Sequence, residues 1–115
     1  MPRHILALDL KDDPALIEDY RRWHRPGGPP EAVTRSIRAA GITALEIFLT
    51  GNRLVMILEA EEGFTLAAKG AGDAGDPEVQ QWEALMWRFQ QALPWAKPGE
   101  KWVEMERIYA LSEHP

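Results

Sequence analysis

The chain has 115 residues, of which 45% are hydrophobic, and it carries a formal net charge of −5. This length predicts one domain over residues 1–115, with a core that needs neither disulfides nor a structural metal. The absence of cysteine excludes a disulfide framework, a thiolate nucleophile and a zinc site built on sulfur. We expect a cytoplasmic protein, because the chain has neither a secretory start nor the roughly 20 consecutive apolar residues of a membrane span.

The charge distribution argues against nucleic acid as a partner. The 13 Lys and Arg residues are scattered among 18 Asp and Glu residues, whereas binding to backbone phosphates depends on clustered basic residues. Five tryptophans are many for this length; they fit either core packing or aromatic platforms for a sugar.

The first part of the chain predicts a strand followed by two helices. Residues 3–10 alternate with one very apolar face, which is typical of a strand. A carboxylate before Pro14 can cap a helix over residues 13–24, and the RPGGPP segment ends this helix with a tight loop. A second helix is expected over residues 30–40, with Gly41 placed to terminate it.

The second part predicts a hairpin, a helix and a last strand. Residues 42–49 and 53–60 are β-rich and are joined by three turn residues. Residues 62–69 predict a helical turn or two, and 69–76 read as a mobile internal loop because they are small and polar. Apolar residues at helical spacing then predict a helix from Asp76 to Leu93. A strand is expected over 102–110.

This order, βαββαβ, predicts an α+β fold of the ferredoxin-like, split βαβ type, in which an antiparallel sheet carries its helices on one face. Both faces of the central strands are apolar, since Val55 and Ile57 alternate with Leu54, Met56 and Leu58. No further segment is left to cover the second face, so we expect a homodimer.

His24 is the most interesting ionisable residue, because imidazole exchanges protons near neutral pH. On a helix it lies one turn after Tyr20, so both side chains can face one pocket beside the Pro/Gly loop. Alternatively, His24 only caps the helix C-terminus. His4 and His114 are expected to be structural or idle. The three histidines offer no i, i+4 pair, so no metal site is predicted.

Three carboxylates, Glu46, Glu59 and Glu83, interrupt otherwise apolar patterns. Each is either buried for a function or paired with a cation or solvent at an edge. The sequence contains no Gly-rich phosphate loop, nucleophile elbow or dinucleotide fingerprint, which argues against a kinase, a hydrolase and a dehydrogenase.

Several short motifs, in order, carry a family resemblance. They are Tyr20, Arg21, Arg22 and His24 on the first helix, Pro30–Glu31, Gly41–Ile42, Glu59 at the end of the hairpin, and the segment from Asp76 to Trp82. Over nearly its whole length the chain resembles the L-rhamnose mutarotase family. The segments GIxxxEIF, QxWExLMxxFQ and PGEKW are most similar to the L-fucose mutarotase branch.

The resemblance implies a dimeric α/β barrel without a cofactor that interconverts the α and β anomers of a 6-deoxyhexose. It implies that His24 is the proton donor and that Tyr20 and Trp82 contact the sugar. Two positions depart from the rhamnose pattern: Leu45 replaces a sugar-contacting tyrosine, and Glu83 replaces a second tryptophan. The loop after His24 is also one residue longer and lacks a tryptophan. L-rhamnose as the substrate is therefore in question.

We predict that His24 protonates the ring oxygen and that Glu83 is the base, with Glu46 and Glu59 as alternatives. Leu45 and Glu46 join Tyr20 and Trp82 as candidate substrate-binding residues. Two other functions stay open from the sequence: a cofactor-free monooxygenase on a similar dimeric barrel, and a non-catalytic dimer that binds a small ligand.

Overall fold

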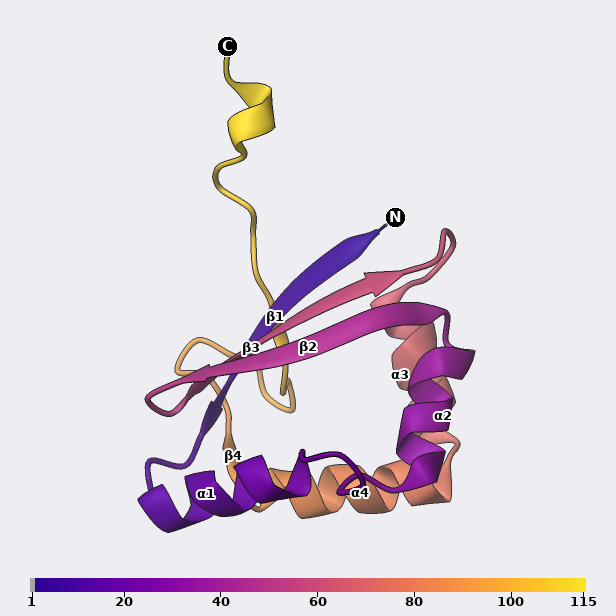
Figure 1. Cartoon of the computed structure of the whole chain (residues 1–115), viewed down its shortest axis with the longest axis vertical. Helices are drawn as coiled ribbons and strands as arrows, with labels where there is room; N and C mark the ends of the chain where they lie inside the picture. Colours follow the sequence, from indigo (N-terminus) through magenta and orange to yellow (C-terminus); the bar gives the residue numbers. More distant parts are fainter. Residues whose placement is uncertain (1) are drawn as a thin grey trace.

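The computed structural model describes residues 2–115 and consists of an antiparallel sheet with helices on one face (Figure 1). Its sheet has five strands in the order β2-β3-β1-β4, and β5 also pairs with β1. The elements are β1 (Arg3–Leu10), α1 (Pro14–Trp23), α2 (Glu31–Ala39), β2 (Ile42–Thr50), β3 (Arg53–Ala60), α3 (Leu66–Ala74), α4 (Pro77–Trp87), β4 (Gln90–Gln91), β5 (Val103–Glu104) and a 3-10 turn (Leu111–Glu113). The predicted ferredoxin-like α+β fold is confirmed.

Helices α1 and α4 begin at the same local signal. Asp13 accepts hydrogen bonds from the main-chain N–H groups of Ala15 and Leu16 at 2.9 and 3.2 Å. Asp76 caps α4 in the same way, and a proline follows each aspartate at the first helical position. These carboxylates satisfy N–H groups that have no partner inside the helix, which fixes where each helix starts.

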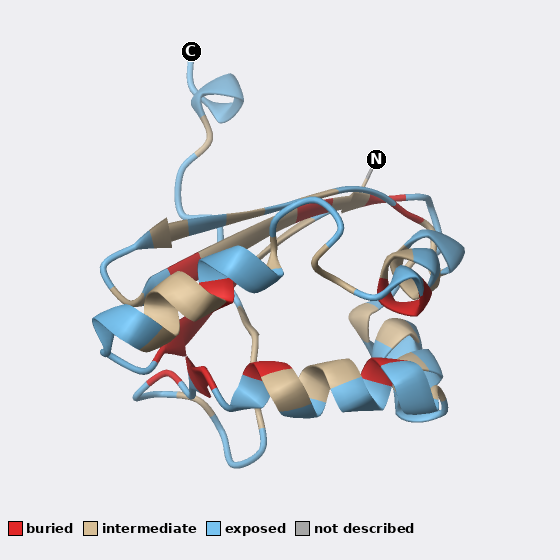
Figure 2. Cartoon of the chain, turned by 60° about the horizontal axis from the view of Figure 1, so that its bottom comes forward, coloured by how far each residue is buried: buried red, intermediate tan, exposed pale blue. Residues whose placement is uncertain are grey.

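The two faces of the sheet differ in burial because strand register assigns alternate side chains to opposite sides. On the inner face, Leu6 pairs with Met56 and Leu8 with Leu54, beneath the helices. Figure 2 shows that the buried residues gather on β1 and on the helix surfaces turned toward it. No helix of residues 2–115 lies over the outer face, where Phe48 is 52% exposed.

Segment 69–76 corrects one expectation, because most of it is helical in α3 and does not form a mobile loop. Thr65 caps α3 by accepting a hydrogen bond from the N–H of Ala68 at 3.0 Å. Lys69 and Asp73 pair one turn apart within it. The cap, the alanines and this ion pair offset the low helix propensity of the two glycines inside α3.

Helix α4 ends at Trp87, so its predicted extension to Leu93 is wrong. After a tight last turn the chain becomes extended, and Gln90 and Gln91 pair with Leu10 and Asp9 of β1. The free edge of β1 offers main-chain hydrogen bonds there, and pairing with it takes the place of further helical bonds.

The last strand is much shorter than the predicted 102–110, and β1 has no residue to pair with the end of that range. Val103 and Glu104 pair with Ala7 and Leu6. In this antiparallel register β1 has no residue left for the segment beyond Arg107. The remaining tail leaves the body of the protein in Figure 1. None of the helices in residues 2–115 is long and apolar enough to cross a membrane.

Candidate functional site

A cavity of about 350 Å³ lies between the inner face of the sheet and the helices. Its volume falls within the range of small-molecule sites, and its wall is mostly apolar with a few polar groups, as such sites usually are. His24, Tyr20, Trp82, Glu83 and Leu45 all line it. The structure therefore brings together five of the six residues expected to act on or bind the ligand.

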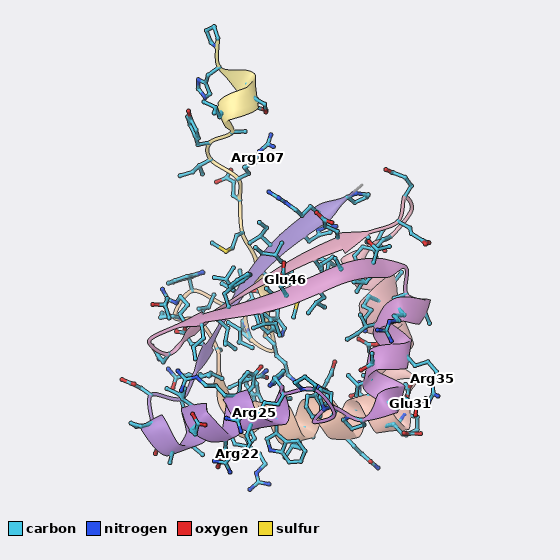
Figure 3. All side chains as sticks on the ribbon, in the orientation of Figure 1. Arg22, Arg25, Glu31, Arg35, Glu46 and Arg107 are labelled. Atoms are coloured by element: carbon cyan, nitrogen blue, oxygen red, sulfur yellow. The ribbon has the colours of Figure 1, made fainter. Side chains whose placement is uncertain are left out.

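Glu46 is the exception, since register places it on the other side of the sheet. It pairs with Ile57 on the outer face, whereas its neighbour Leu45 pairs with Leu58 on the inner face. Figure 3 shows Glu46 on β2, away from α1 and α4. The expectation that Glu46 contacts the ligand is corrected for this reason. Glu59 also belongs to the outer face, where it pairs with Arg3 and Ala44.

His24 is held by the residue one turn before it on α1. Its Nδ1 lies 2.7 Å from the main-chain carbonyl oxygen of Tyr20. A carbonyl oxygen only accepts hydrogen bonds, so Nδ1 carries a proton and donates it, and Nε2 is the ring nitrogen that remains for a ligand. The two rings also contact each other, with centroids 4.3 Å apart. This contact and the hydrogen bond fix the orientation of the imidazole.

Burial lowers the pKa of His24 below the usual imidazole value, and the hydrogen bond to the Tyr20 carbonyl partly opposes this effect. Desolvation disfavours the charged form of a basic group. The resting imidazole is therefore neutral at neutral pH. When Nε2 does take up a proton, it gives that proton up more readily than an exposed histidine would.

Tyr20 is almost fully buried and is tied to β4 through its hydroxyl. The side-chain amide of Gln90 donates to the phenolic oxygen at 3.1 Å. Burial raises the pKa of the Tyr20 phenol, while this hydrogen bond opposes the rise. The phenol consequently stays protonated at neutral pH, which makes it a hydrogen-bond donor for a ligand and a poor base.

Trp82 and Glu83 come from the middle of α4, which faces α1 across the cavity. The Trp82 ring lies 5.6 Å from the His24 ring and 6.0 Å from that of Trp23, both in edge-on geometry. Glu83 is half-buried, and its Oε2 lies 3.4 Å from the side-chain nitrogen of Gln80. A ligand in this cavity thus meets an imidazole, a carboxylate and an aromatic ring.

The structure adds polar residues that sequence reasoning missed. Gln90 is buried in the cavity wall, and Lys69 and Asp73 reach the cavity from α3. The i, i+4 spacing of Lys69 and Asp73 was a readable signal, but it lay in a segment assigned to a loop. Gln90 gave no signal, because its role depends on β4 leaving the helix.

The described residues contain no cluster of three or more His, Asp or Glu side chains placed to hold a metal ion. The polar groups of the cavity come from separate elements: His24 from α1, Glu83 from α4 and the Lys69–Asp73 pair from α3. Together they offer one group that titrates near neutrality, one carboxylate and one ion pair. Proton transfer between oxygen atoms of a small polar ligand is within reach of this set.

Comparison with known proteins gives three findings. A family profile for L-rhamnose mutarotase matches residues 3–111. An L-fucose mutarotase from Xanthomonas campestris pv. campestris is 58% identical over 113 residues, covering 98% of this chain and 90% of that protein. The crystal structure of an L-rhamnose mutarotase from Formosa agariphila aligns with a TM-score of 0.70 at 14% identity, covering 96% of this chain and 99% of the other.

A second solved structure shares the fold at a similar level. Tetracenomycin F2 cyclase from Streptomyces glaucescens, a type-II polyketide cyclase, aligns with a TM-score of 0.64 at 13% identity, covering 96% of this chain and 98% of the cyclase. At such identities a structural likeness concerns the fold alone, because one fold hosts many activities.

Proposed function

Because the chain belongs to the L-rhamnose mutarotase family, we propose that it is a sugar mutarotase that interconverts the α and β anomers of a 6-deoxyhexose. One observation carries the proposal: His24 is fixed by the Tyr20 carbonyl at the wall of a cavity that it shares with Trp82 and Glu83. This arrangement supplies an oriented proton-transfer group, a carboxylate and an aromatic surface to one small ligand.

Mutarotation needs two proton transfers. The minor imidazolium form of His24, which carries a proton on Nε2 as well as on Nδ1, gives the Nε2 proton to the ring oxygen as the bond between this oxygen and C1 breaks. Glu83 takes the proton of the anomeric hydroxyl, and C1 becomes an aldehyde carbon. The aldehyde turns about the C1–C2 bond, and both transfers reverse as the ring closes on the other face. Positioned acid–base groups of this kind accelerate a reaction by roughly 10²- to 10⁴-fold.

The lowered pKa of His24 suits this cycle. The imidazolium donates readily because burial disfavours its charge, and the neutral ring that results can take the proton back during closure. At each stage of the cycle only one of the two groups carries the mobile proton: His24 before ring opening and Glu83 after it. Tyr20, whose phenol stays protonated, donates a hydrogen bond to the sugar, and Trp82 packs against its apolar face.

The apolar wall of the cavity favours a 6-deoxy sugar as the substrate. Leu45, Met56 and Leu58 line it from the sheet, and an apolar surface of this kind favours a methyl group over a hydroxymethyl group at C6. Leu45 stands where the rhamnose pattern has a tyrosine. Of the two candidate sugars we therefore favour L-fucose, which is also named for the 58% identical relative.

We also propose that the protein is a cytoplasmic homodimer that closes into a barrel. The exposed Phe48 and the half-buried Val55 and Ile57 form an apolar patch on the outer face of the sheet. The protruding tail carries further exposed apolar residues, among them Ile108 and Leu111. A second copy of the chain covers such a surface most simply, and the lack of cysteine fits the reducing cytoplasm.

Saturation-transfer NMR tests the activity directly, because a mutarotase speeds exchange between the two anomeric proton signals of a free sugar. We expect faster exchange with L-fucose than with L-rhamnose. Replacing His24 by Asn in a folded protein should remove most of the acceleration, since the donor at the ring oxygen is lost. An unchanged exchange rate in the His24→Asn variant would contradict the proposal.

The same assay ranks the carboxylates. If Glu83 is the base, Glu83→Gln should lower the rate of anomer exchange roughly 10²-fold or more. Glu46→Gln and Glu59→Gln change groups that lie across the sheet from the cavity. Equal rates in all three variants would point to a water as the base. Oxygen consumption with a quinol, without anomer exchange, would favour the monooxygenase alternative, and sugar binding without exchange would favour a binding protein.

A further inference from the structure

The ion pair between Lys69 and Asp73 on α3 is unusual in its burial. Lys69 Nζ donates to both carboxylate oxygens of Asp73, at 2.6 and 2.5 Å, and only 17% and 16% of the two side chains is exposed. Arg35 and Glu31, an i, i+4 pair at the surface of α2 in Figure 3, are 66% and 89% exposed. Removing two charges from water has a desolvation cost in free energy, and an exposed pair avoids this cost.

The pair borders the cavity and can be reached by a ligand. Lys69 and Asp73 line the cavity together with His24 and Glu83. The same two side chains also border an open groove of about 640 Å³ between α2 and α3. In Figure 1, α3 closes the side of the space beneath the sheet, while α1 and α4 lie along its floor.

One turn of α4 connects the ion pair to the proton-transfer groups. The side-chain nitrogen of Gln80 donates to the main-chain oxygen of Asp73 at 2.8 Å and lies 3.4 Å from Glu83 Oε2. Trp82 contacts His24. Gln80 and Trp82 are two residues apart, which is roughly 3 Å of axial rise in a helix. Lys69 and Asp73 thus border the same cavity as His24 and Glu83, and Gln80 links the main chain of Asp73 to the Glu83 side chain.

The chemistry of the pair matches adjacent hydroxyl groups. An ammonium group has three N–H donors, and the two bonds to Asp73 leave at least one for a ligand. The carboxylate keeps free lone pairs, so one hydroxyl can accept from Lys69 while its neighbour donates to Asp73. Hydrogen bonds that involve a charged partner are stronger than those between neutral groups. Hydroxyls on one side of the ring present this combination best.

We propose that Lys69 and Asp73 form the subsite that selects the sugar by its hydroxyls at C3 and C4. These carbons lie across the pyranose ring from C1 and the ring oxygen, where His24 and Glu83 act. The two hydroxyls are cis in L-fucose and trans in L-rhamnose, so the pair distinguishes these sugars. This inference rests on the proposed mutarotase function and adds the source of its substrate specificity.

The test compares the double variant Lys69→Met/Asp73→Leu with a matched control, Arg35→Met/Glu31→Leu, which removes the exposed pair of α2. Replacing a buried ion pair by apolar residues is often neutral or stabilising, so the variant should fold. Exchange NMR gives kcat and KM for L-fucose, for its C4 epimer 6-deoxy-L-glucose and for its C2 epimer 6-deoxy-L-talose.

We expect the double variant to lose roughly tenfold to a hundredfold in kcat/KM for L-fucose, mainly through KM, as expected for lost hydrogen bonds to charged groups. The preference in kcat/KM for L-fucose over its C4 epimer should be lost, while the preference over its C2 epimer persists. The control pair should keep all three values. Asp73→Asn, which keeps the side-chain shape, should shift the C4 preference in the same direction.

Two results would overturn the inference. One is a folded double variant with wild-type kcat/KM for L-fucose, and the other is an equal loss for L-fucose and both epimers, which would make the pair structural. If the double variant does not fold, the C4 preference of Asp73→Asn decides. A wild-type protein that accelerates no sugar would instead refute the proposed function itself, and this inference with it.

Discussion

At the scale of single residues, the site depends on polar groups that are satisfied by partners from other elements. The Tyr20 carbonyl fixes His24, and Gln90 from β4 fixes the Tyr20 hydroxyl. Each hydrogen-bond partner lies in or next to the buried core, so removing one partner of a pair leaves the other polar group without a hydrogen bond. Such losses cost more than the bond itself contributes.

The Tyr20–Gln90 bond can be tested by a double-mutant cycle. Gln90→Leu leaves the buried phenol unsatisfied and should cost about 1–3 kcal/mol of unfolding free energy, and Tyr20→Phe should cost a comparable amount. The double variant should be closer to the wild type than the sum of the two, because neither polar group is then left alone. Urea denaturation measures all four proteins, and strict additivity would show that the bond contributes nothing.

His24 should make the stability of the fold depend on pH. Burial lowers its pKa in the folded state below the value near 6.5 of the unfolded chain. Between these two pKa values the unfolded chain binds more protons, so stability is complete above about pH 6.5 and falls as the pH drops through the lower pKa, by at most about 1.4 kcal/mol per unit. His24→Gln should remove this part of the pH dependence in denaturation curves. A variant as pH-sensitive as the wild type would refute the assignment.

At the scale of elements, the loop after α1 lies next to His24 and packs closely against the end of that helix. The N–H of Gly28 donates to the carbonyl of Arg25 at 2.8 Å, and the loop turns back tightly against the end of α1. A Cβ atom at Gly28 would lie 2.2 Å from the carbonyl oxygen of Trp23. Here glycine is required for close approach, because no side chain fits between the loop and the helix.

Gly28→Ala should therefore displace the loop beside His24 and reduce both mutarotation and thermal stability. Gly27→Ala is the matched control: its φ of 85° is also strained for alanine, but nothing lies within 4 Å of the added atom. We expect this control to lose about 1 kcal/mol of stability and to keep more activity. Equal activity losses in the two variants would show that backbone strain, and not the close approach, matters.

At the scale of the whole molecule, the outer face of the sheet and the tail expose large apolar side chains. Phe48 is 52% exposed on β2, and Ile108 and Leu111 are 89% and 75% exposed on the tail. Figure 1 shows the tail leaving the body of the protein. Large apolar side chains gathered in this way mark surfaces that another chain covers.

We expect a dimer in solution, measured by light scattering during size-exclusion chromatography. Deleting residues 108–115 should weaken the dimer, and Phe48→Glu should weaken it further by placing a charge in the interface. As a control, Trp87→Glu changes a tryptophan that is 41% exposed on α4, on the helix side of the sheet and outside the tail. A monomeric wild type would contradict the proposed assembly.

Local signals in the sequence determined much of this protein. Proline and aspartate caps placed α1 and α4, the strand periods placed β1, β2 and β3, and the i, i+4 spacing placed Tyr20 and His24 on one side of α1. These features are local, because caps and periodicity act within a turn or a strand. The family motifs then indicated the activity.

Tertiary contacts decided the rest. Register, which depends on pairing between distant strands, placed Leu45 in the cavity and Glu46 outside it. Beyond Trp87 the chain pairs with the free edge of β1, and the limited length of β1 leaves no partner for the segment beyond Arg107. The segment that carries Lys69 and Asp73, expected to be a loop, is helical and packs beside α4. Which polar groups meet in the cavity depends on contacts between residues far apart in the chain, and no local pattern encodes these contacts.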